Sequence, residues 1–81
     1  MTEQMSADMA YRWHDGDIYA PTGFLILART GDDLNAVHVE SRKVARVSGV
    51  AIKCDGRAES VQRELDRACA KLLREIARDR S

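Results

Sequence analysis

The stretch from Arg57 to Arg80, close to the C-terminus, constrains the fold more than any other part of the chain. Apolar side chains return along it every three or four residues, which places them on one side of an α-helix. They are Val61, Leu65, Ala68, Leu72 and Ile76, and Cys69 and Leu73 widen this stripe. An amphipathic helix is held mainly by packing its apolar side against another element. The preceding residues must therefore supply the surface that this helix covers.

The first part of that surface is predicted to be a β-hairpin. Residues 9–13 alternate large apolar side chains with others, which is the period of a half-buried strand. A short helix over residues 5–13 is the alternative, and it is less favoured because aromatic residues suit strands. The Asp15-Gly16 pair suits a tight turn, so residues 18–19 are expected to pair back on the first strand.

A fully apolar run predicts a central strand. Every residue from 24 to 28 is apolar, which is typical of a strand covered on both faces. Pro21 and Gly23 end the preceding piece, and residues 31–33 supply turn chemistry after the run. One helix covers only one face of a sheet. Cover for the second face is expected from the N-terminal segment or from a second subunit.

The next strand is expected to have two different faces. After Asn35, Val37 and Val39 alternate with His38 and Glu40, so the polar face would present an imidazole and a carboxylate. Its end is open between a turn at residues 41–43 and a continuation to Val47. A break or bulge is expected near Gly49, because the valines on either side do not share one register.

Residues 50–54 are then predicted to form the last strand, and Asp55 or Ser60 is expected to cap the helix. The predicted fold class is α+β: a small antiparallel sheet of three to five strands followed by one long C-terminal amphipathic helix packed on one face. Residues 1–8 are expected to be a flexible tail, and residues 9–81 a single domain. A chain of 81 residues has a limited core. Association into a homodimer would add stability.

The charges limit the possible partners. Thirteen basic and thirteen acidic residues cancel, so no overall field steers the chain toward nucleic acid or an anionic membrane, and a DNA mimic is disfavoured. The N-terminus lacks the basic start and apolar run of a signal peptide. The longest apolar run is too short to span a bilayer. A cytoplasmic location is therefore the expectation.

The chemistry-bearing residues predict neither a metal site nor an enzyme. His14, His38, Cys54 and Cys69 are zinc donors by type, but no pair has ligand spacing. The two cysteines are interpreted as buried, reduced thiols, and their pairing is left open. His38 and Glu40 have no accompanying nucleophile or oxyanion loop. No cofactor, metal or catalytic residue is predicted.

The aromatic residues of the N-terminal part are the leading candidate for a partner site. The first 35 residues carry two basic and six acidic residues, and exposed Trp and Tyr side chains with charged neighbours are good anchors at protein interfaces. The predicted partner-binding residues are Tyr11, Trp13, Asp15, Asp17 and Tyr19. In the competing interpretation, these aromatic side chains build the core.

The outer face of the C-terminal helix is the second candidate. Cations follow one another every three or four residues there, opposite the apolar stripe. They are Arg63, Arg67, Lys71, Arg74 and Arg78. Such a row can contact phosphates, although a solvated face interleaved with carboxylates is the more common meaning of the pattern. Cations at residues 42, 43 and 46 would add to it only if the strands bring them to the same side.

These observations lead to two hypotheses. The first is a small non-enzymatic protein-binding module that regulates or inhibits a larger assembly, a profile typical of accessory proteins of phages and other mobile elements. The alternative is a nucleic-acid-binding protein that uses the basic outer face of the helix.

Overall fold

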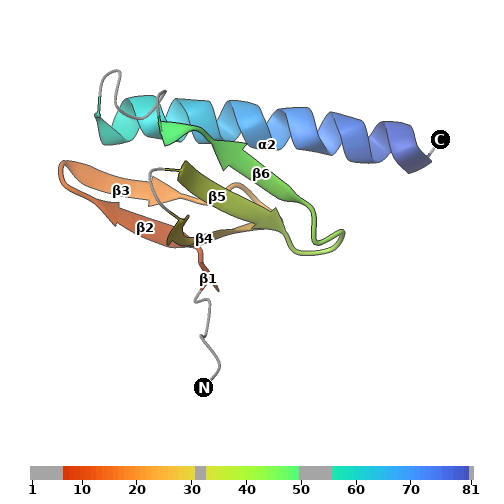
Figure 1. The fold of residues 1–81 in the computed structure, drawn as a ribbon, viewed down its shortest axis with the longest axis horizontal. Helices are drawn as coiled ribbons and strands as arrows, with labels where there is room; N and C mark the ends of the chain where they lie inside the picture. Colours follow the sequence, from red (N-terminus) through yellow and green to blue (C-terminus); the bar gives the residue numbers. More distant parts are fainter. Residues whose placement is uncertain (1–6, 31–32, 50–55, 81) are drawn as a thin grey trace.

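The computed structural model describes residues 7–30, 33–49 and 56–80. The described strands are β1 (Ala7–Asp8), β2 (Ala10–Trp13), β3 (Gly16–Tyr19), β4 (Phe24–Thr30), β5 (Asp33–His38) and β6 (Val44–Val47), and they precede the long helix α2 (Ala58–Arg80). Strands β1, β4, β5 and β6 form an antiparallel sheet in the order β1-β4-β5-β6, while β2 and β3 form a separate hairpin. Helix α2 lies along one side of both, so the predicted α+β arrangement is confirmed (Figure 1).

The N-terminal hairpin forms as the alternation predicts. Tyr11 pairs with Ile18, and Trp13 pairs with Gly16, so the connecting loop is the two residues His14 and Asp15. The alternative of a short helix over residues 5–13 is wrong within the described residues. The end of the predicted tail at residues 1–8 also belongs to the sheet, because Ala7–Asp8 pairs with β4 as β1.

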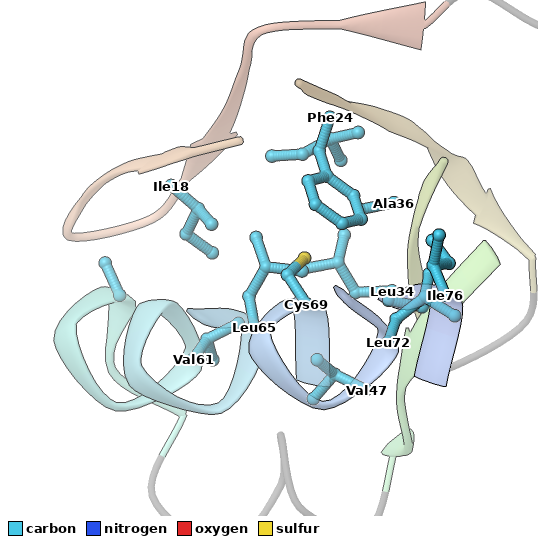
Figure 2. Packing of buried hydrophobic residues seen from close by; sticks show 13 residues of the cluster. Ile18, Phe24, Leu34, Ala36, Val47, Val61, Leu65, Cys69, Leu72 and Ile76 are labelled. Atoms are coloured by element: carbon cyan, nitrogen blue, oxygen red, sulfur yellow. The ribbon is translucent and has the colours of Figure 1, made fainter. Parts of the chain in front are cut away.

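The core lies between α2 and the inner face of the strands (Figure 2). On α2 the fully buried side chains include Val61, Leu65 and Cys69, as the apolar stripe predicts. Leu73 departs from that prediction, because it is 43% exposed. Figure 2 shows the Cys69 sulfur pointing from the helix toward the strands.

Small residues in the sheet leave room for this helix. Ile26 of β4 pairs with Ala36 of β5, and Ala36 pairs with Ala45 of β6. All three are buried, and the two alanines allow α2 to pack closely on that part of the sheet. Helix contacts concentrate on β6 and β3.

Strand β5 has the opposite face inward from the predicted one. Leu34 and Ala36 are fully buried, so the pleat places Val37 on the outer face. The strand ends at His38, and Val39 is 55% exposed in the following turn. The predicted polar face with His38 and Glu40 is therefore wrong. Neighbouring side chains of a strand point to opposite faces, so an error of one residue in the assignment exchanges the two faces. The error comes from Val39, which the prediction counted as part of the strand although it lies in the turn.

The turn after β5 is the first of the two predicted alternatives. Residues 39–43 connect β5 to β6, and the backbone N–H of Arg42 donates to the His38 carbonyl at 2.7 Å. Arg42 has a φ of 64°, a conformation that glycine adopts more readily than arginine. Strand β6 ends at Val47, in keeping with a break near Gly49. The predicted last strand over residues 50–54 lies outside the described residues.

Both ends of α2 are tied to loops of the strand layer. The helix begins at Ala58, whose backbone N–H donates to Asp15 Oδ1 at 2.9 Å. Ser60 lies inside the first turn and is not the cap, and Asp55 is outside the described residues. At the other end, Lys43 Nζ contacts Asp79 at 2.8 Å and Arg80 pairs with Glu40. The turn after β5 therefore holds the last turn of the helix.

Candidate functional site

The tip of the β2–β3 hairpin is bonded to the start of α2. Trp13 Nε1 donates to the Gly56 carbonyl at 2.7 Å, and His14 Nε2 lies 2.6 Å from the same oxygen. A carbonyl oxygen has two lone pairs, so it can accept from both rings. Asp15 supplies an acceptor to an N–H at the helix N-terminus, where a negative charge is also favoured by the helix dipole. Trp13, His14 and Asp15 therefore all hold the hairpin to the start of α2.

Strand β3 is held to the helix through its backbone. The N–H of Tyr19 donates to Gln62 Oε1 at 2.7 Å, and Gln62 Nε2 donates to the Tyr19 carbonyl at 2.8 Å. The amide of Gln62 therefore pairs with β3 much as a residue of a neighbouring strand would. The side chain of Tyr19 takes no part in these two hydrogen bonds and is 59% exposed.

The predicted partner residues are divided between the two faces of the hairpin. Tyr11 and Trp13 are half-buried against the core, with ring centroids 6.1 Å apart. Asp15 contacts the helix start. Asp17 and Tyr19 lie on the opposite, exposed face of β3. The five residues do not form one surface.

The basic row of α2 is exposed as predicted, but carboxylates reduce its field. All five cations, Arg63, Arg67, Lys71, Arg74 and Arg78, are exposed. Arg63 lies 3.4 Å from Glu59, and Arg67 lies 3.1 Å from Glu64. Of the cations contributed by the turn and β6, Lys43 pairs with Asp79, and the Arg46 side chain approaches Asp33 at 3.8 Å.

A groove runs between β6 and α2. Its two halves have volumes of about 190 and 280 Å³ and share Arg46, Ala68 and Lys71. The apolar atoms in it come from both elements, with Val44 and Leu72 at one end and Val47 at the other. Glu75 and Glu64 lie beside the cations, so both signs of charge line the groove.

The sheet also has an apolar outer face, opposite the side that α2 covers. Leu25, Val37 and Val44 are directly aligned across β4, β5 and β6, and we call them the outer row. Leu25 and Val37 are half-buried, and Val44 is 49% exposed. Leu27, also half-buried, lies beside the row on the same face of β4. The sequence signal for this face was the absence of alternation in residues 24–28. The wrong face assignment in β5 concealed its continuation through Val37.

The His, Cys, Asp and Glu side chains of the described residues form no metal-binding group. No cluster of three His, Cys, Asp or Glu side chains that could hold a metal occurs among them. The His38 ring packs against Phe24 in a tilted arrangement with ring centroids 5.1 Å apart, and its Nδ1 lies 2.8 Å from Ser41 Oγ. The hydrogen bond from Arg80 holds the pKa of Glu40 below its usual value. Burial raises the pKa of the Cys69 thiol to about 11, with a smaller contribution from Asp66. Such a thiol is a poor nucleophile at neutral pH.

Comparison of the chain with protein-family models, with curated proteins and with solved structures gave no match. Among the described residues, no helix has the length and apolar character needed to cross a membrane.

Proposed function

We propose that this chain is a non-enzymatic protein-binding module that regulates or inhibits a larger assembly, as small accessory proteins of phages and other mobile elements do. The outer face of its sheet is the binding surface. It receives an apolar face of a partner protein.

The outer row is the observation that carries this proposal. Leu25, Val37 and Val44 run straight across three strands, on the face opposite the buried Ile26, Ala36 and Ala45. Single exposed apolar side chains are common on protein surfaces, whereas apolar side chains that adjoin one another more often mark a site of interaction. Polar side chains lie beside the row on the same face. Asn35 of β5 and Arg46 of β6 are aligned with Leu27 of β4, two residues away from the row along each strand. An apolar centre with polar neighbours is the usual composition of a protein interface.

A substitution in the centre of the row tests the proposal. Val37→Lys places a charge between Leu25 and Val44 without touching the inner face, and its fold can be checked by circular dichroism and thermal melting. Val39→Lys is the matched control, because Val39 is 55% exposed in the turn outside the sheet. Tagged wild type and the control are expected to retain the same partner from an extract of the source, and Val37→Lys to lose it. Equal recovery with Val37→Lys would refute the role of the outer row.

Nucleic-acid binding is the second candidate, favoured by one observation. Arg67 and Lys71 of α2 are both exposed and line the same groove. Phosphate contacts by such cations would give an affinity that decreases steeply with salt. The double variant Arg67→Glu, Lys71→Glu should then abolish binding of single-stranded and duplex DNA and RNA at low salt. Unchanged binding by the double variant, or none by the wild type, would eliminate this candidate.

A further inference from the structure

The turn that connects β5 to β6 holds Arg42 in a backbone conformation that disfavours arginine. The φ angle of Arg42 is 64°, in the left-handed region, where the Cβ of an L-residue crowds a backbone carbonyl oxygen. Glycine adopts this region freely, and asparagine tolerates it better than most residues. No other residue with a side chain has a positive φ in the part of the chain that the structure describes. Residues held in such conformations cluster at functional sites, and the stability of the fold does not account for an arginine here.

The Arg42 side chain is also the charged group of this turn that folding leaves unused. Glu40 pairs with Arg80. Lys43 Nζ contacts Asp79 at 2.8 Å, so both of these turn side chains reach the last turn of α2. Arg42 is exposed, and its guanidinium forms no hydrogen bond or ion pair with any residue that the structure describes. Because a guanidinium stays protonated in proteins, the turn presents a fixed positive charge to solvent.

The turn that carries this charge is held in one conformation. The backbone N–H of Arg42 donates to the His38 carbonyl at 2.7 Å, and that of Lys43 donates to Ser41 Oγ at 3.2 Å. Ser41 Oγ also lies 2.8 Å from His38 Nδ1. The two ion pairs to α2 hold the same segment from outside. A segment that is already ordered loses little conformational freedom when a partner binds, so more of the contact energy remains as affinity.

Arg42 lies at the end of the outer row. Val37 and Val44 face each other across β5 and β6. The next pair along the ladder, His38 and Lys43, closes the turn through a hydrogen bond of 2.8 Å. Arg42 is two residues from Val44, so their Cα atoms are within about 7 Å of each other. Protein interfaces have an apolar centre and a polar rim, and Arg42 has the position of a rim residue.

We propose that the Arg42 guanidinium binds a carboxylate of the partner protein whose apolar face covers the outer row, an inference that rests on the proposed function of that row. The planar fork of a guanidinium matches a carboxylate with two parallel hydrogen bonds. Nucleic acid is a less suitable occupant, because phosphate binding draws on several cations, and the neighbouring Lys43 is engaged by Asp79. The strained backbone is the stability cost of presenting an arginine beside the outer row.

Three substitutions of Arg42 separate the side chain from the backbone. Arg42→Gly and Arg42→Asn remove the guanidinium from a backbone conformation that both new residues accept, so both variants should melt at or above the wild-type temperature. Arg42→Lys retains a positive charge without the planar fork. Arg12→Asn is the matched control, because Arg12 is exposed on the β2–β3 hairpin, outside the sheet that carries the outer row.

The partner retained by the tagged wild type from an extract of the source is purified, and its Kd is measured for each variant by titration calorimetry. Arg42→Gly and Arg42→Asn should bind it about tenfold more weakly, since they lose a charge-assisted contact. Arg42→Lys should be intermediate, and Arg12→Asn should bind as the wild type does. The difference between the wild type and Arg42→Gly should shrink when NaCl is raised from about 0.05 to about 0.5 M, because salt screens exposed charges.

Four results would overturn the proposal. Equal affinity of Arg42→Gly and the wild type would remove Arg42 from the interface, and the proposed function would still stand if Val37→Lys loses the partner in the same assay. Lower melting temperatures of both Arg42→Gly and Arg42→Asn would show that the arginine stabilises the fold. Retention that disappears when the extract is treated with nuclease would assign Arg42 to phosphates. A wild type that retains no partner would overturn the proposed function together with this inference.

Discussion

Asp15→Ala is the most informative change for the structure of this fold. The carboxylate of Asp15 accepts a hydrogen bond from the N–H of Ala58, 43 residues later in the sequence, at 2.9 Å. It therefore acts as a helix cap supplied by a hairpin loop instead of by the preceding residue. The change should weaken α2 where it joins the hairpin and leave the opposite end unaffected.

The expected cost follows from the geometry of this cap. Loss of an N-terminal capping side chain typically costs about 1 kcal/mol, and a carboxylate at this end also gains from the helix dipole. Because the Asp15 side chain is partly exposed, water replaces some of the lost interaction. We expect a decrease of about 1–1.5 kcal/mol in the free energy of unfolding, or about 5–10 °C in Tm for a domain of this size.

Urea and thermal unfolding of matched variants measure this effect. Asp17→Ala removes the same charge two residues away, where the side chain is exposed on β3, and it should cost less than about 0.5 kcal/mol. Asp15→Asn keeps an acceptor oxygen without the charge, so its stability should lie between those of the wild type and Asp15→Ala. If Asp15→Ala and Asp17→Ala are equally stable, the cap contributes nothing and the reasoning is wrong.

Three further changes test the core and the turn. Leu65→Ala, at a fully buried site, should lower the free energy of unfolding by about 3–5 kcal/mol in urea, whereas Leu73→Ala, at a 43% exposed site, should cost less than about 1 kcal/mol. Folding raises the pKa of the Cys69 thiol from about 9 to about 11. The buried neutral thiol therefore contributes its full stabilisation below pH 9, and this stabilisation is lost as the pH rises from 9 toward 11, because the unfolded chain ionises first. Stability should decrease by about 1–2 kcal/mol across that window, and this component should be missing in Cys69→Val. Arg42→Gly removes the side chain that makes a φ of 64° unfavourable, so it should raise the free energy of unfolding by about 0.5–1 kcal/mol and raise Tm with it. A lower Tm would show that contacts of the Arg42 side chain outweigh the cost of its backbone conformation.

The sequence predicts the parts of this fold whose periodicity is long or whose turn chemistry is specific. The stripe of α2 continues from Val61 to Ile76, so a single exception such as Leu73 does not change the assignment. The alternation and the Asp15-Gly16 pair predict the hairpin, although its loop is one residue earlier, at His14 and Asp15, and Gly16 is already in β3. Strand β5 is short, and Val39 after its end extends the alternation that begins at Val37. The prediction therefore places the outward-facing side of β5 on the inside. The cap of α2 was not predictable from local spacing, because its acceptor comes from a distant loop.

The candidate surfaces were predictable only in part. Exposure of the basic row follows from the helical period, and its pairing with Glu59 and Glu64 follows from the i,i+4 and i,i+3 spacing, whereas the approach of Arg46 to Asp33 depends on how β5 and β6 pair. The aromatic residues of the hairpin alternate as a strand should. Which side of that strand meets the helix could not be read from the alternation.

The position of Trp13 affects how any loss of partner binding must be interpreted. Its indole is half-buried and donates to Gly56, so Trp13→Ala would loosen the hairpin from α2 even if no partner ever touched it. Val37→Lys gives a cleaner test, because Val37 lies on the outer face of β5 and its substitution removes no hydrogen bond between the hairpin and the start of the helix. This variant should lose partner binding without a large loss of thermal stability, whereas Trp13→Ala should lose thermal stability whether or not it loses the partner. A Trp13→Ala chain that melts with the wild type and no longer binds the partner would instead place the indole in the binding surface.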